Sequence, residues 1–93
     1  MSVEVRIPAV FRAHTAGAKS VTAEGATIGD VLSDVVRSYP ELGGQIFTDD
    51  DSLHRFVNVY LNDEDVRYLG GLSCEISDGD VLAILPAVAG GLT

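Results

Sequence analysis

The strongest constraint on the fold is a single amphipathic helix predicted between residues 28 and 39. Apolar side chains recur there with the i, i+3, i+4 spacing that places them on one stripe of an α-helix: Ile28, Val31, Leu32, Val35 and Val36. Thr27 is the expected N-cap, with Asp30 three residues on, and Pro40 ends the helix after Tyr39. Such a helix must pack its stripe against a second layer, so the other segments should supply a sheet.

Strands are predicted on both sides of this helix. Period-two alternation or β-branched content marks five segments: residues 3–7, 18–23, 56–61, 66–68 and 81–85. Residues 62–65 read as a turn, and the segments holding Phe11 and Gly43-Gly44 read as loops. One helix covers only one face of a sheet. We therefore expect an α+β fold, with a mixed four- or five-stranded sheet and one main helix on one face.

Composition narrows the classes of function. Six Lys and Arg against 14 Asp and Glu give a net charge of −8, which disfavours binding to nucleic acid or to an anionic membrane surface. No apolar run approaches the roughly 20 residues that span a bilayer, and the N-terminus does not read as a secretory signal. Cys74 is the single cysteine, so an internal disulfide is excluded. We expect a cytoplasmic protein that is a monomer when free.

Catalytic and metal-binding patterns are weak. His14 and His54 lie far apart on predicted loops, and Cys74 has no CxxC partner. The acidic run 49–51 lacks the turn glycine and closing glutamate of a calcium loop, and no phosphate-binding loop is present. We expect no metal, no bound cofactor and no intrinsic enzyme activity.

The C-terminal segment is the most informative motif. The last predicted strand leads through Pro86-Ala87-Val88-Ala89 into Gly90-Gly91, after an Asp-Gly-Asp turn at 78–80. Together with the order of strands and helix, this ending resembles the ubiquitin-like β-grasp sulfur carriers of the ThiS and MoaD family. Residues 53–67 and the ending Ile84–Gly91 resemble more narrowly the carriers that serve O-phosphoserine-dependent cysteine biosynthesis.

The resemblance implies a fold and a function. The first and last strands would be parallel neighbours in a β-grasp domain of residues 1–86, followed by a flexible tail, 87–93. An E1-like enzyme would adenylate the Gly91 carboxylate with ATP, and a sulfur donor would then leave a thiocarboxylate. A cysteine synthase-like or other biosynthetic enzyme would accept the sulfur. Pro86 would stiffen the base of the tail, while Val88, Ala89 and Gly90 are slim enough to thread into a narrow partner site.

The sequence departs from the family pattern at its end. The active form of these carriers ends at the second glycine, whereas here Leu92 and Thr93 follow Gly91. Either a peptidase removes these two residues, at a processing site between Gly91 and Leu92, or they are vestigial or were added in cloning. A zinc JAMM-type peptidase, which works beside such carriers, would be the expected partner for this step.

A partner-docking patch is predicted on the sheet face away from the helix. Strand alternation turns Val57, Val59 and Leu61 toward the helix, together with Leu82 and Ile84. The outward apolar residues would then form one patch beside the tail: Phe56, Tyr60, Val81 and Leu85.

Three alternative functions remain at the sequence level. The chain could be a MoaD-like small subunit of molybdopterin synthase, whose partner would be the large subunit. It could also be a ubiquitin-like protein modifier, or a plain binding module that uses the sheet face. Lys19 is the only lysine, which disfavours chain-building conjugation.

Overall fold

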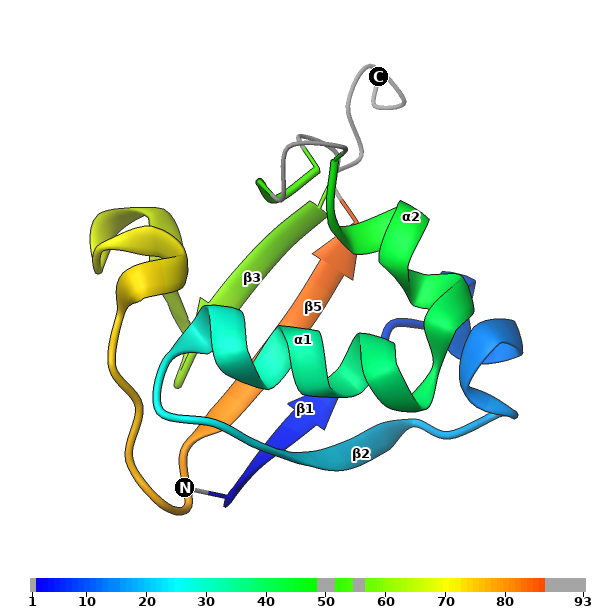
Figure 1. Ribbon diagram of the computed structural model, residues 1–93, viewed down its shortest axis with the longest axis horizontal. Coiled ribbons are helices and arrows are strands. Elements are labelled where there is room, and N and C mark those ends of the chain that lie inside the picture. The colour runs from blue at the N-terminus through cyan, green and yellow to red at the C-terminus, as the bar shows by residue number, and fades with distance from the viewer. Residues whose placement is uncertain (1, 49–51, 55–56, 87–93) are drawn as a thin grey trace.

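The computed structural model describes residues 2–48, 52–54 and 57–86 of the 93-residue chain. Within them one mixed sheet has the strand order β2-β1-β5-β3-β4, and helix α1 crosses one of its faces (Figure 1). The bounds are β1 Ser2–Arg6, β2 Ser20–Glu24, α1 Ile28–Ser38, β3 Val57–Leu61, β4 Glu64–Asp65 and β5 Val81–Pro86. This is the predicted α+β architecture, in its five-stranded form.

The sheet is built around a parallel pair. β1 and β5 pair in parallel, with Val5 opposite Leu82, and each is also the antiparallel neighbour of a second strand. β2 forms a hairpin with β1 at one edge, and β4 forms a hairpin with β3 at the other. The prediction of parallel central neighbours is confirmed.

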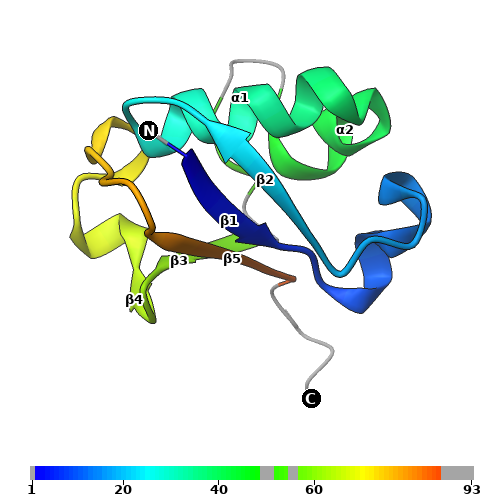
Figure 2. The ribbon, with the colours of Figure 1, turned by 90° about the horizontal axis from the view of Figure 1, so that it is seen from below.

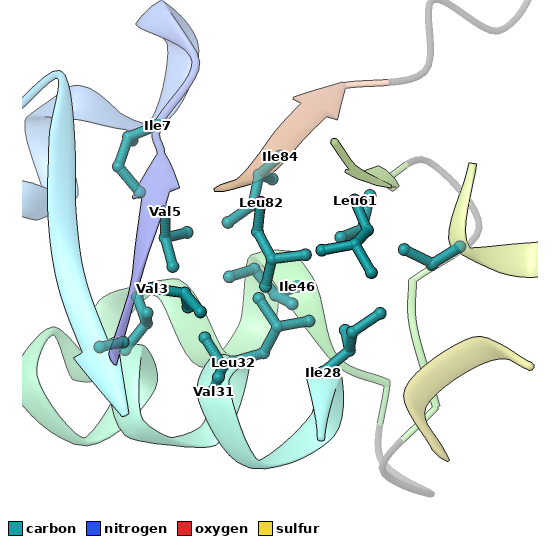
Figure 3. Close-up of a cluster of buried hydrophobic side chains, with 14 of the residues drawn as sticks. Val3, Val5, Ile7, Ile28, Val31, Leu32, Ile46, Leu61, Leu82 and Ile84 are labelled. Atoms are coloured by element: carbon teal, nitrogen blue, oxygen red, sulfur yellow. The ribbon is translucent and has the colours of Figure 1, made fainter. Parts of the chain in front are cut away.

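Helix α1 begins and ends as its sequence predicts. The hydroxyl of Thr27 accepts a hydrogen bond from the Asp30 N–H at 3.2 Å, and Tyr39 is the C-cap before Pro40. The helix buries its apolar stripe against the sheet side chains of β1, β3 and β5 (Figure 3). Four stripe residues are buried, namely Ile28, Val31, Leu32 and Val35, while Val36 at the margin is half-buried.

The predicted strand at residues 66–68 is wrong. β4 is only Glu64–Asp65, and Val66–Tyr68 form a 3₁₀ helix, η3. The Asp65 carboxylate accepts a hydrogen bond from the Arg67 N–H at 2.9 Å, which bends the chain out of the sheet. This bend places Val66 fully in the core, at 0% exposure.

Two predicted loops contain helical turns. Ala9–Thr15 form the 3₁₀ helix η1, which buries Phe11. Gly43–Ile46 form the short helix α2, following the 3₁₀ turn η2 at Pro40–Leu42. Leu42 and Ile46 are both fully buried, so packing of this i, i+4 pair stabilises a helical turn despite its two glycines. A further 3₁₀ turn, η4, spans Gly71–Ser73.

In the part of the chain that the structure describes, no helix has the length and apolar character needed to cross a bilayer.

Candidate functional site

The site is built on the end of β5, the strand that precedes the C-terminal tail. β5 pairs with both β1 and β3, and its inward residues Leu82 and Ile84 are 0% and 1% exposed. Pro86 is its last residue and lies opposite Val57. The first half of β5 is held on both sides, and its last three residues are paired with β3, so the position of Pro86, to which the tail is joined, is fixed.

Several predicted site residues lie outside the described residues. They are Phe56, Ala87, Val88, Ala89, Gly90, Gly91 and Leu92. The threading, sulfur-carrying and processing roles given to them stay predictions. Pro86, predicted as the base of the tail, is half-buried at the end of β5.

The face of the sheet opposite α1 carries the other predicted docking residues. For the residues that the structure describes, Figure 2 shows α1 and α2 on one side of the sheet and no helix over the other side of β5 and β3, which we call the open face. Val57, Val59 and Leu61 point away from it into the core, as predicted. On the open face, Leu85 is 44% exposed, and Tyr60 and Val81 are half-buried.

Charged side chains of β1 interrupt this apolar surface. In the sheet register Glu4 lies beside Val81, and Arg6 lies beside Ala83, which in turn faces Tyr60. Asn58 lies opposite Leu85. The open face is therefore mixed, with an apolar strip along β5 between polar and charged neighbours.

Sequence reasoning missed a hollow on this face. It has a volume of about 520 Å³ and is lined on the β1 side by Arg6, Arg12 and Lys19 and on the β5 side by Ala83 and Leu85. Strand alternation alone could have turned Arg6 toward the open face. Arg12 lies in η1 and Lys19 directly precedes β2, and no sequence pattern marked either residue.

Hydrogen bonds fix the two arginines of the hollow. Arg12 Nε donates to the carbonyl of Ile7 at 3.1 Å, which ties η1 back to the end of β1. Arg6 Nε donates to Glu4 Oε2 at 3.1 Å, and both side chains are exposed. An exposed pair of this kind contributes little to stability.

Asp65, His14 and Cys74, which lie outside the hollow, each take part in a hydrogen bond within the fold. The Arg67 side chain donates to the Asp65 carboxylate (Nη2 to Oδ2 2.6 Å), and with the Arg67 backbone N–H it holds the pKa of Asp65 below its ordinary value. His14 Nδ1 lies 2.9 Å from Glu41 Oε1 and links η1 to η2. Cys74 is half-buried against the core, and its thiol donates to the Glu75 carbonyl. Among the described residues no cluster of His, Cys, Asp and Glu could hold a metal ion.

Comparison with known proteins agrees with this fold. The ThiS family model matches residues 5–91. The sulfur carrier protein CysO of Mycobacterium tuberculosis is 52% identical over 93 residues, covering 98% of this chain and 100% of the relative.

Solved structures also match the fold of this chain. A crystal structure of the BexX/CysO complex of Amycolatopsis orientalis contains a chain 52% identical to this one, with a TM-score of 0.87 over 96% of this chain and 99% of that chain. The solution structure of small archaeal modifier protein 1 from Methanosarcina acetivorans is 32% identical, with a TM-score of 0.86 over 97% of this chain and 96% of that one.

The strand order and the position of α1 define a ubiquitin-like β-grasp fold. The chain belongs to the ThiS family. It is a sulfur carrier protein and not an enzyme.

Proposed function

We propose that Gly91 is the residue that carries the sulfur. An E1-like partner would join the Gly91 carboxylate to AMP from ATP and release pyrophosphate. A sulfur donor would then attack the acyl carbon and displace AMP, which leaves a thiocarboxylate. The carrier itself holds no cofactor in this scheme, since ATP binds to the partner. We place the protein in the cytoplasm, where ATP is available.

The position of β5 supports this proposal most directly. Gly91 follows Pro86 by five residues, so a fully extended tail would place it at most about 18 Å beyond the sheet. Residues 87–91 have no side chain larger than valine. A slim segment on a fixed strand end can enter a narrow active site while the domain stays outside it.

The acceptor of the sulfur would be a cysteine synthase-like or another sulfur-inserting enzyme. The 52% identity to the M. tuberculosis CysO supports a carrier of this kind, and so does the A. orientalis CysO in its complex with BexX. Tyr60, Val81 and Leu85 would form the apolar part of the docking surface for such partners, with Phe56 as a further predicted member.

Processing would come before loading. In the chain with Leu92 and Thr93 attached, the Gly91 carboxyl is part of a peptide bond and cannot be adenylated. A JAMM-type peptidase would remove both residues with a zinc-bound water that attacks the Gly91 carbonyl. The match to the family model also ends at Gly91.

Intact mass spectrometry tests the central proposal. The chain ending at Gly91 is incubated with ATP, an E1-like enzyme of the same organism and a sulfide source. The expected product is heavier by the difference between one sulfur and one oxygen atom. A chain ending at Gly90 is the matched control. It lacks the proposed attachment residue, so its mass should not increase. If the Gly91 form stays unmodified while the enzyme loads a known carrier, the proposal is wrong.

Protein modification is the second candidate. It is favoured by the 32% identity to an archaeal protein named as a modifier. In this case the same activated Gly91 would pass to an amine of a target protein. The two functions differ in product, because conjugation yields a species heavier by a whole target protein, whereas loading changes a single atom.

A further inference from the structure

The distribution of positive charge over the chain is uneven. The chain has six Lys and Arg side chains, and three of them, Arg6, Arg12 and Lys19, line the hollow on the open face. The net charge of the chain is −8, so half of its basic side chains lie together on a protein that is acidic overall. Like charges repel, and although Arg6 is offset by its ion pair with Glu4, placing Arg12 and Lys19 beside it does not stabilise the free domain.

Among the described residues, two of these cations have no acidic partner within ion-pair distance. The ion pairs within the described residues are Arg6–Glu4, His14–Glu41, Arg37–Asp34 and Arg67–Asp65, so Arg12 and Lys19 take part in none of them. Hydrogen bonds to Ile7 nevertheless hold the Arg12 side chain and the backbone of Lys19. Arg12 is bonded to the Ile7 carbonyl, and the Ile7 N–H donates to the Lys19 carbonyl at 2.8 Å.

The acidic and basic side chains of the hollow lie toward opposite ends of it. Glu4 and Asp63 line it too, and Glu4 lies beside Val81 at the start of β5. Arg6 lies beside Ala83, and the chain continues from Arg6 to Ile7 in the direction in which β5 runs. Arg12 Nε and the Lys19 carbonyl are both hydrogen-bonded to Ile7, so these two residues lie toward the end of β5, where Leu85 is exposed. Because β1 and β5 are parallel, the cationic end of the hollow is the end from which the tail departs.

We propose that the cationic end of this hollow docks onto acidic side chains around the active-site entrance of the enzyme that receives the tail. The proposal rests on the function proposed above and adds the chemistry of the partner. Carboxylates of the partner would pair with Lys19 and Arg12, and Leu85 would contact an apolar surface between them. Such pairing fixes the rotation of the carrier about its tail and speeds association more than it raises affinity.

Charge reversal at one residue tests the docking. Lys19→Glu and Arg37→Glu change the net charge equally, but Arg37 is an exposed residue of α1, on the covered face of the sheet. Binding of each variant, ending at Gly91, to the purified E1-like enzyme and to the sulfur acceptor is measured by surface plasmon resonance. Lys19→Glu should weaken binding to at least one of them by about tenfold, mainly through the association rate. Arg37→Glu should leave it near wild type. Equal effects of the two variants, or none from Lys19→Glu, would overturn the proposal.

Salt dependence separates a protein partner from a small anion. Raising NaCl from about 0.05 to about 0.5 M should slow association of the wild type strongly and of Lys19→Glu much less. Sodium sulfate at matched ionic strength should act like NaCl. A much stronger effect of sulfate, lost in Lys19→Glu, would assign the hollow to a small anion and contradict the proposal.

Cross-linking identifies the partner residues directly. A carbodiimide activates a carboxylate, and a nearby amine then forms an amide bond. Because Lys19 is the only lysine, its adducts are unambiguous once those of the N-terminal amine are set aside. The expected adduct joins Lys19 to an Asp or Glu at the entrance of the partner's active site. Adducts confined to other surfaces would refute the docking mode.

Sulfur loading of the wild type distinguishes the two proposals. If the wild type acquires sulfur and Lys19→Glu binds and loads equally well at low carrier concentration, only the docking proposal fails. If the wild type acquires no sulfur from an active enzyme, the proposed function itself fails.

Discussion

The side chain of Asn62 joins the turn between β3 and β4 to the start of β5 through Val81. Its Oδ1 accepts a hydrogen bond from the Val81 N–H at 3.1 Å, while the Asn62 N–H donates to the Val81 carbonyl at 2.9 Å. Asn62 Nδ2 also donates to Asp80 at 3.2 Å. Asn62 and Asp63 have φ of 48° and 72°, which suits a tight two-residue hairpin. One residue thus aligns β5, the strand that precedes the tail, with its neighbour β3.

Replacing Asn62 should loosen this alignment. Asn62→Ala removes the side-chain hydrogen bonds. It also leaves at positive φ an alanine, which tolerates this backbone conformation less well than asparagine does. The free energy of unfolding should therefore fall by about 2–3 kcal/mol. Asn62→Gly loses the same bonds without the backbone strain and should be less destabilised. Urea denaturation of both variants measures the difference. Equal midpoints would show that the positive φ adds no strain.

Leu85→Asp should separate folding from partner binding. Leu85 is 44% exposed on the open face, so an aspartate there remains solvated and the fold should persist. Partner binding should weaken severely, because contact of the leucine side chain with the partner is lost and a charge must be desolvated. Leu82→Asp, at a fully buried position of the same strand, should unfold the domain. Circular dichroism and binding assays check both variants, and an unfolded Leu85→Asp domain would contradict the face assignment.

Two glycines should respond oppositely to the same added methyl group. A Cβ on Gly25 would lie 2.6 Å from Asp30 Cβ and 2.8 Å from the Val31 nitrogen, so Gly25→Ala must displace the first turn of α1. We expect a loss of about 1–3 kcal/mol in unfolding free energy. A Cβ on Gly44, within α2, would meet nothing within 4 Å, and Gly44→Ala should raise stability by up to about 1 kcal/mol. Thermal unfolding compares the two variants. If Gly25→Ala is as stable as Gly44→Ala, the first turn of α1 moves aside without a cost in stability, and the prediction is wrong.

The pair of Asp65 and Arg67 should make stability depend on pH. Hydrogen bonds from the Arg67 side chain and backbone lower the pKa of Asp65 in the fold. Its carboxylate therefore adds stability above the unfolded-state pKa of about 3.9, and this is lost as pH falls through the lowered folded-state pKa. Arg67→Gln should be less stable than the wild type at pH 7, and the two should converge in strong acid. Urea denaturation at several pH values measures the gap, and a gap independent of pH would argue against the ion pair.

Removal of Leu92 and Thr93 should make the carrier competent for sulfur loading. The full chain should be inert toward ATP and the E1-like enzyme, because its Gly91 carboxyl is blocked, while the form ending at Gly91 should acquire sulfur. Treatment with a JAMM-type peptidase should convert the first into the second without changing the melting temperature. Intact mass before and after treatment gives the result. Sulfur on the untrimmed chain would show that the Gly91 carboxyl is not the attachment point.

Local sequence patterns determined the main elements of this fold. Thr27 and Asp30 cap α1 as predicted, because a cap depends on residues only three positions apart. The inward and outward faces of β3 and β5 follow from the two-residue period of a strand, and the burial of Val59 and Leu82 agrees with it. The tail motif, which is read directly from the chain, indicated the ThiS family.

Contacts between distant segments decided the rest. Residues 66–68 have strand-like composition, yet burial of Val66 in the core, together with the local hydrogen bond from the Arg67 N–H to Asp65, makes them the 3₁₀ helix η3. Leu42 and Ile46 impose helix α2 on a glycine-rich segment, because burying both outweighs the poor helix propensity. Arg12 and Lys19 meet Arg6 only after η1 and the first hairpin have formed. Sequence alone could not place that hollow, because side chains separated by a loop come together only through the path the loop takes in three dimensions.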